Sequence, residues 1–159
     1  MIRINDDLLN ELSAKARKSL RLRMNHNFHT GPEDKLQRML NAMEPGTYIR
    51  PHKHENPDKR EAFFALRGTL CVIEFNALGE VTDHTILSVE KVNYGAEIAE
   101  RTWHSIISLE SGSVAYEVKD GPYNPLDDKD FAPWAPAEGS KDAESYLKQL
   151  IEQLHLSVD

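Results

Sequence analysis

The 159-residue sequence is poor in cysteine and in long apolar runs. Its single cysteine, Cys71, leaves no partner for an intramolecular disulfide, which fits a reducing compartment. We interpret Cys71, within the apolar run LCVIEF, as a small buried hydrophobic residue. No apolar run approaches the roughly 18 residues of a membrane-spanning helix, so we expect no membrane span. The acidic, amphipathic start lacks the features of a secretory signal, which predicts a cytoplasmic location.

Basic residues are also scarce: 19 lysines and arginines against 26 acids give a formal net charge of −7. A negative overall field repels phosphate backbones, so the composition disfavours nucleic-acid binding. Five bases do gather between Lys15 and Arg23, but their near-helical spacing is typical of a solvated helix face. The chain length and the 40% share of hydrophobic residues predict one domain with a single core.

What the sequence does contain is a series of short β-type runs. The six runs are TYIRPH, AFFALRG, TLCVIEFN, VTDHTILSVE, TWHSIISLE and SVAYEVKDG. They recur at roughly ten-residue intervals with no helical pattern between them, which favours an antiparallel sandwich or barrel. A hairpin is predicted with its turn at residues 76–79, and LRLRMNHNF is a candidate first strand.

Helical patterns lie at both ends of the chain. Apolar residues recur every fourth position from Leu8 to Leu20 behind an N-cap at Asn5, which predicts an amphipathic helix over about residues 6–20. A second helix is predicted after an N-cap at Ser140, with an apolar stripe formed by Leu147, Leu150, Ile151 and Leu154. The segment 121–139 is rich in proline yet carries three aromatic residues, so we expect an ordered arm against the barrel.

Residues 35–43 carry two conflicting patterns. Leu36, Met39, Leu40 and Met43 follow helical spacing, but alternate residues of the same segment also satisfy the period of a strand. Periodicity alone favours a helix here. The choice between helix and strand therefore stays open from the local pattern.

The strongest chemical signal lies between Gly46 and Gly68. His52 and His54 stand two residues apart, so in an extended strand they project from the same face, about 7 Å from each other. Two imidazoles placed in this way can share one metal ion. Glu61 follows in the same stretch, and a later β-type run begins with Thr102-Trp103-His104.

This pattern resembles the two motifs of the cupin superfamily. The resemblance implies an all-β double-stranded β-helix, or jelly-roll barrel, flanked here by N- and C-terminal helices. The metal ligands that it implies are His52, His54, Glu61 and His104, with Glu55 as a substitute for Glu61. Three nitrogens and one oxygen suit a single Fe, Mn, Ni, Co or Zn divalent ion and leave up to two octahedral positions open for water or substrate.

A closer likeness spans about residues 21–139. The segments that carry it are RMNHNFH, QRMLNAMEPGTYIRPHKH, REAFFALRG, TWHSIISLESGSVAYEVKDGPYNP and DKDFAPWAPAEG. They resemble the WbuC family of cupin-fold metalloproteins, which is often associated with bacterial O-antigen gene clusters and has no firmly assigned reaction. This resemblance implies that residues 35–43 form a strand. Together with the patterns described above, it leads us to expect an N-terminal helix in residues 1–20, a barrel in 21–120, and the arm with the last helix in 121–159, all within one domain.

Strand parity predicts which side chains surround the metal. Arg50 and Tyr48 share the parity of His52, and Arg38 lies on a strand expected to be adjacent. An inward arginine would bind a carboxylate or phosphate in two-pronged fashion. The full set of pocket candidates is Arg50, Tyr48, Arg38, His29, Tyr116 and Lys119. We assign no catalytic residue, and we interpret His84 and His155 as ordinary surface histidines.

Three functions follow from these features, all with a small-molecule ligand. The first is an isomerase- or epimerase-like enzyme that acts on a sugar- or nucleotide-sugar-derived substrate in bacterial surface polysaccharide metabolism. The second is an Fe(II)-dependent oxygenase, because two open metal positions can bind substrate and oxygen together. The third is a non-catalytic, metal-dependent protein that binds a sugar or small acid. The cupin resemblance also implies a homodimer, since cupins commonly pair through terminal extensions.

Overall fold

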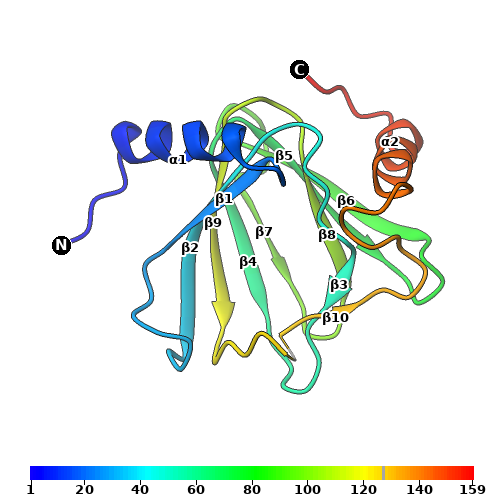
Figure 1. Ribbon diagram of the computed structural model, residues 1–159, viewed down its shortest axis with the longest axis horizontal. Helices are drawn as coiled ribbons and strands as arrows, with labels where there is room; N and C mark the ends of the chain where they lie inside the picture. Colours follow the sequence, from blue (N-terminus) through cyan, green and yellow to red (C-terminus); the bar gives the residue numbers. More distant parts are fainter. Residues whose placement is uncertain (127) are drawn as a thin grey trace.

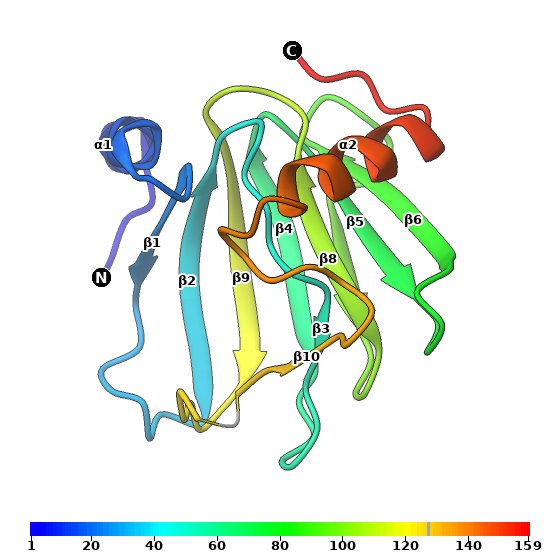
Figure 2. The same ribbon diagram turned by 45° about the vertical axis from the view of Figure 1, so that its right-hand side comes forward.

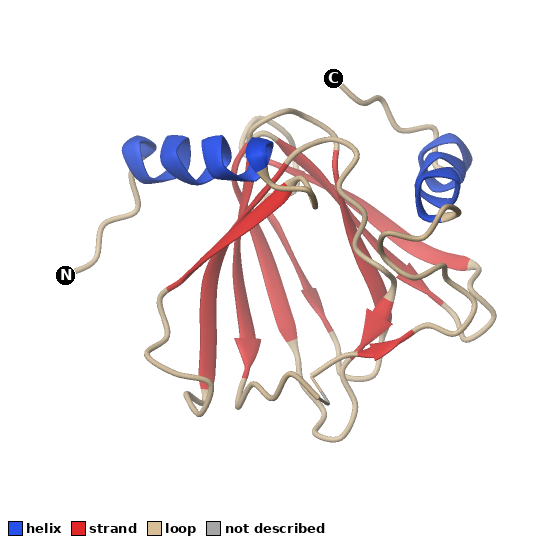
Figure 3. Ribbon diagram, viewed as in Figure 1, coloured by secondary structure: helices blue, strands red, loops and turns tan. Residues whose placement is uncertain are grey.

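The computed structural model describes residues 1–126 and 128–159; Asp127, within the predicted arm, lies outside the described residues. Two five-stranded antiparallel sheets face each other, and each carries a helix on its outer side (Figures 1 and 3). In spatial order, the first sheet holds β1 (Arg23–Asn27), β2 (Leu36–Met43), β9 (Ser113–Asp120), β4 (Glu61–Arg67) and β7 (Gly95–Ile98). The second holds β10 (Asp130–Phe131), β3 (His52–Lys53), β8 (Trp103–Ser108), β5 (Thr69–Phe75) and β6 (Val81–Ser88).

Alternation along the strands builds the core. On β5, Leu70 and Val72 enter the cluster between the two sheets, whereas Cys71 and Ile73 point to the opposite face. Cys71 is fully buried there, as the sequence predicted. The predicted hairpin is also confirmed, because β5 and β6 pair and the Asn76 N–H donates to the Glu80 carbonyl across the turn. The all-β prediction with a helix at each end therefore holds.

Helix α1 (Asp6–Lys18) covers the outer face of the first sheet (Figure 1). Its N-cap is Asn5, as predicted, with the side-chain oxygen accepting from the Leu8 N–H. Its buried apolar residues pack on β2 and β9; they are Leu9, Leu12 and Ala16. Arg67, at the end of β4, donates to the Leu9 carbonyl and to Ser13 Oγ, which ties the helix to the sheet.

Helix α2 (Ala143–Gln153) covers the outer face of the second sheet. Leu147 and Leu150 are its buried leucines, and they pack against β5 and β8, so the sheet covers the predicted apolar stripe. The predicted N-cap, Ser140, is wrong: the cap position is Asp142, which makes no side-chain capping hydrogen bond. Neither α1 nor α2 combines the length and apolar character needed to cross a bilayer, within the residues that the structure describes.

Residues 36–43 form strand β2, so the helical pattern of this segment is misleading and the strand implied by family resemblance is correct. Leu40 and Ala42 face α1, and the alternate residues Met39 and Met43 face the interior between the sheets. Since both faces of β2 meet apolar surroundings, its apolar residues fall at helical and strand spacings alike. Tertiary pairing with β1 and β9 decides the outcome.

The arm runs from the end of β9 to α2 and passes along the second sheet beside β3 (Figure 2). Its short strand β10 pairs with β3, placing Phe131 opposite His52. Strands β7 and β10 have no counterpart among the runs predicted from the sequence, and β3 is only two residues long where a six-residue run was expected. The arm thus supplies part of the wall next to the two histidines.

Candidate metal centre

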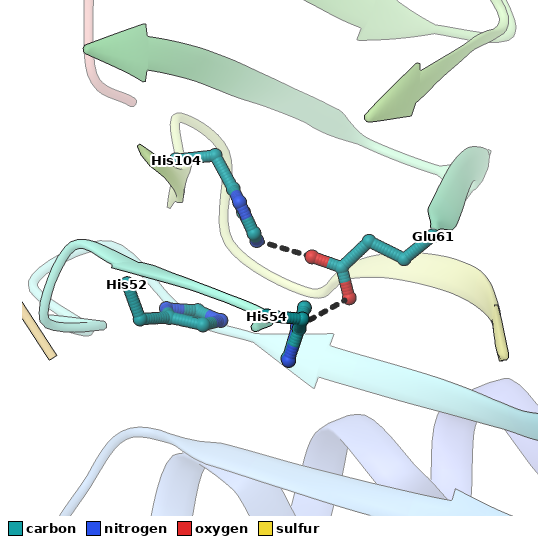
Figure 4. Close-up of side chains that lie close together, drawn as sticks. All are labelled: His52, His54, Glu61 and His104. Atoms are coloured by element: carbon teal, nitrogen blue, oxygen red, sulfur yellow. Dashed lines mark ion pairs between the residues drawn. The ribbon is translucent and has the colours of Figure 1, made fainter. Parts of the chain in front are cut away.

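Four side chains from three segments of the chain lie close together (Figure 4). His52 on β3 lies directly opposite His104 on β8, and His54 follows just after β3. Glu61 reaches the same point from β4, in the other sheet. Their ligand atoms all lie within 4.8 Å of one another, and no residue of the four is more than 4% exposed. The structure therefore brings together the four predicted ligands.

The other ring nitrogen of each histidine is held by a backbone carbonyl. His52 Nδ1 lies 3.0 Å from the Arg50 carbonyl, His104 Nδ1 lies 2.8 Å from the Thr102 carbonyl, and His54 Nδ1 contacts the Asp128 carbonyl. A carbonyl oxygen only accepts, so each Nδ1 must carry the proton. Each Nε2 then keeps a free lone pair, the arrangement typical of metal-binding histidines.

At the centre of the cluster, buried polar atoms of the histidines and of Glu61 have no hydrogen-bond partner among the described residues. His54 Nε2 lies 3.5 Å from Glu61 Oε2, and His104 Nε2 contacts Glu61 Oε1. Within the described residues, no hydrogen bond reaches His54 Nε2, His104 Nε2 or Glu61 Oε1. Buried polar atoms are rarely left without a partner, and one divalent ion would satisfy all of them. The donor set therefore fits a metal ion.

The protonation of the cluster agrees with this fit. Burial, followed by the charge of Lys129, holds the pKa of His52 well below its ordinary value, so the imidazole is neutral and able to bind a metal. Burial works to raise the pKa of Glu61, but the contacts with His104 and His54 outweigh it and hold that pKa well below its ordinary value. A neutral imidazole and a carboxylate are the forms that a metal ion requires.

A cavity of 400 Å³ opens beside the cluster, between the two sheets. His52, Glu61 and His104 form part of its wall. The rest of the wall is mixed: apolar residues such as Phe63 and Ile106 alternate with amides and charged groups. This combination of a few directed polar groups on an apolar surface is typical of a small-molecule site.

Of the six predicted pocket residues, His29 and Lys119 line the cavity. Arg50 and Tyr48 do not, and the prediction that they share an inward face is wrong. Arg50 donates to the Ala132 carbonyl and lies over the Phe131 ring, while the Tyr48 hydroxyl donates to the Pro136 carbonyl. Strand parity does not apply here, since residues 47–51 lie outside any strand.

Arg38 and Tyr116 also lie outside the cavity wall, because they have the opposite parity to the residues that form it. On β2 and β9 the inward side chains are the odd-numbered ones. Arg38 donates to the Phe28 carbonyl, and Tyr116 packs near Phe28 in the cluster beneath α1. Glu55, the substitute ligand, pairs with Lys53 instead of joining the cluster.

Two acidic wall residues, Glu117 and Asp128, were missed from the sequence. Glu117 accepts a hydrogen bond from Asn41 Nδ2, and burial, with Glu61 next, raises the pKa of its carboxyl. The parity of Lys119 on β9 would have found Glu117, two residues earlier. Asp128 stands in the irregular arm, where no periodic signal exists.

Asp128 accepts charge-assisted hydrogen bonds from two lysines, at 2.6 Å from Lys59 Nζ and 2.8 Å from Lys119 Nζ. All three residues are at most 4% exposed. Burial works to lower the pKa of Lys119, but Glu117, Glu61 and Asp128 outweigh it and raise that pKa. The Lys119 ammonium is therefore charged at neutral pH.

Several solved structures share this fold. Protein SO0799 from Shewanella oneidensis matches 99% of this chain and 100% of its own, with a TM-score of 0.58 and 10% identity. L-ribose isomerase from Cellulomonas parahominis matches over 77% of this chain and 72% of its own (TM-score 0.56, 14% identity). The capsular polysaccharide assembling protein CapF from Staphylococcus aureus matches over 67% of this chain (TM-score 0.55, 20% identity). The match covers 28% of CapF, so the chain spans little more than a quarter of that protein.

The two facing sheets have a cupin-type fold, and the buried histidine–glutamate cluster between them is a candidate metal site. No curated protein sequence matches the chain. Residues 4–87, more than half of the chain, match the family model described as a domain of unknown function, DUF6016. The chain belongs to the DUF6016 family.

Proposed function

We propose that the protein is a metal-dependent cupin enzyme with isomerase- or epimerase-like chemistry on a small, polar, sugar-derived molecule. One observation carries the proposal: the cluster of His52, Glu61 and His104 lines a cavity. The carboxyl of Glu117 and the ammonium of Lys119 line the same cavity. The cofactor would be one divalent Fe, Mn, Ni, Co or Zn ion. When bound, it would polarise a carbonyl or hydroxyl oxygen of the ligand.

Glu117 is the residue best suited to move a proton. It lines the cavity, and Asn41 holds one of its carboxylate oxygens by a hydrogen bond. The pKa of Glu117 is raised toward neutral pH, and a group with a pKa near the working pH is the most effective general acid or base. Removal of a proton from a carbon next to a carbonyl, and its return to the neighbouring carbon or to the opposite face, is what isomerisation and epimerisation require. Lys119 and His29 add polar contacts for the ligand.

The biological setting is part of the same proposal. The sequence likeness to the WbuC family suggests bacterial surface polysaccharide metabolism. The fold likeness to a sugar isomerase and to a capsular polysaccharide assembling protein supports a carbohydrate ligand.

The metal part of the proposal is tested by elemental analysis of the purified protein. We expect about one divalent ion per chain. Removal of a group that is only hydrogen-bonded to a metal ligand lowers metal affinity roughly 10–100-fold, so His52→Ala, which removes a ligand, should lower it by more. His84→Ala, an exposed histidine on β6, is the matched control and should retain the ion. Full metal occupancy in His52→Ala would show that the ligands are wrong.

The enzymatic part is tested by solvent exchange. The metal-loaded protein is incubated in D2O with L-ribose and a panel of aldoses, ketoses and sugar acids, and deuterium at carbon is followed by NMR. Glu117→Gln should retain the ion but lose the exchange by a factor of about 100 or more. Sugars that bind without any exchange would favour the non-catalytic binding protein.

A further inference from the structure

Two buried lysines share one aspartate at the inner wall of the cavity. Lys59 and Lys119, at 2% and 4% exposure, share the single carboxylate of Asp128. Taken alone, this triad carries one net positive charge, and the carboxylates of Glu117 and Glu61 also act on Lys119. A ligand anion that reaches the buried Lys119 ammonium would gain a charge-assisted hydrogen bond there.

The two lysines have different surroundings. Lys59 Nζ donates to the Pro122 carbonyl and to Asp128 Oδ1, and it does not line the cavity. Lys119 does line the cavity, and among the described residues it donates one hydrogen bond, to Asp128 Oδ2. An ammonium group has three donors. The Lys59 ammonium therefore serves contacts within the protein, whereas the Lys119 ammonium can donate further hydrogen bonds to a ligand.

The neighbouring carboxylate does not cancel this charge directly. Glu117 is fixed by Asn41, and no ion pair joins Glu117 to Lys119 in the described part of the chain. Across the described lining, four basic side chains accompany three acidic ones: Arg21, Arg23, Lys119 and Lys129 against Glu61, Glu117 and Asp128. The whole chain carries a net charge of −7, so this positive wall is a local feature that the overall composition does not explain.

We propose that Lys119 forms an anion subsite, binding the carboxylate or phosphate group of a monosaccharide-sized acid whose other end reaches the metal cluster. Lys119 lies opposite Glu61 in the β4–β9 register, so the subsite and the candidate metal site are adjacent on the same wall. The volume of 400 Å³ is at the lower end of the range for small-molecule pockets, which suits one sugar ring better than a nucleotide sugar. This inference rests on the proposed function, because it names the ligand class of the same site.

Isothermal titration calorimetry on the zinc-loaded protein tests the subsite with three probes of similar size. The probes are D-gluconate, D-glucose 6-phosphate and the uncharged D-glucitol. At least one acid should bind about tenfold or more tightly than D-glucitol, because a charge-assisted hydrogen bond is added. The two acids distinguish a carboxylate ligand from a phosphate ligand.

Lys119→Met should weaken binding of the acid about tenfold or more and weaken binding of D-glucitol by a clearly smaller factor. This variant is expected to fold, because it leaves Lys59 and Asp128 as a balanced pair. Lys119→Arg should retain a preference for the acid. Lys148→Met, an exposed lysine on α2, is the matched control and should bind as the unaltered protein does.

Equal binding of D-glucitol and both acids, unchanged acid binding in Lys119→Met, or no binding of any probe would overturn the inference. Failure of the proposed function is recognised separately, as failure to retain a metal ion or as absence of solvent exchange. A protein that retains no divalent ion but still binds an acid through Lys119 would support the subsite and contradict the metal proposal.

Discussion

Asp128→Asn is the most informative single change for the stability of the cavity wall. It keeps the volume and a hydrogen-bonding oxygen but removes the one negative charge between Lys59 and Lys119. The side chains of all three residues are at most 5% exposed, so water cannot screen the lysines that remain. Breaking a buried ion pair while leaving its partner charged costs about 3–5 kcal/mol. That is a large part of the roughly 5–15 kcal/mol by which a typical domain is stable.

The measurement is urea-induced unfolding of metal-free protein, followed by tryptophan fluorescence from Trp103 and Trp134. Chelator in the buffer separates the charge effect from any effect on metal binding. Asp120→Asn is the matched control, because the Asp120–Arg60 pair lies at the surface, with Arg60 61% exposed. An exposed pair is worth only about 0.2–1 kcal/mol. A loss in Asp128→Asn no greater than that in Asp120→Asn would refute the reasoning.

Two further predictions concern single positions in the fold. Gly68→Ala should destabilise the protein by about 1–3 kcal/mol or more, because φ is +71° and the added Cβ would lie 2.9 Å from Ser113 Cα. Gly139→Ala, at φ +75° with no atom within 4 Å of its Cβ, should lose only the backbone part of that cost; equal losses in urea unfolding would contradict the packing argument. Cys71 should resist thiol reagents in the native protein up to strongly alkaline pH, because burial raises its pKa to about 12 and so keeps the thiol protonated at lower pH. Labelling by a disulfide reagent should therefore require unfolding. Rapid labelling of the folded protein at pH 8 would contradict this prediction, because it would show that the packing around Cys71 opens in the native state.

The sequence predicted the parts of the fold that depend on local pattern. Alternating runs identified the long strands, and the capping residue Asn5 identified the start of α1. The parity argument for His52 and His54 led to two residues that do lie together, although only His52 belongs to a strand. Local pattern failed at β2, where pairing with two neighbouring strands overrides a helical spacing.

The pocket was harder to predict because its wall depends on irregular segments. Arg50 and Tyr48 point to the arm, since the chain before β3 does not follow the alternation of a strand. Asp128 reaches His54 and two lysines from a segment with no period at all. Glu117, in contrast, stands on a regular strand and could have been predicted from its spacing to Lys119.

Glu61 belongs to the first sheet, whereas His52 and His104 belong to the second. An ion bound by all three would act as a non-covalent cross-link between the two halves of the sandwich. At a free ion concentration of 100 times its dissociation constant, binding would add about 2.7 kcal/mol to the free energy of unfolding. Separation of the sheets would then require release of the ion, so the lifetime of the folded state would depend on the supply of metal around it.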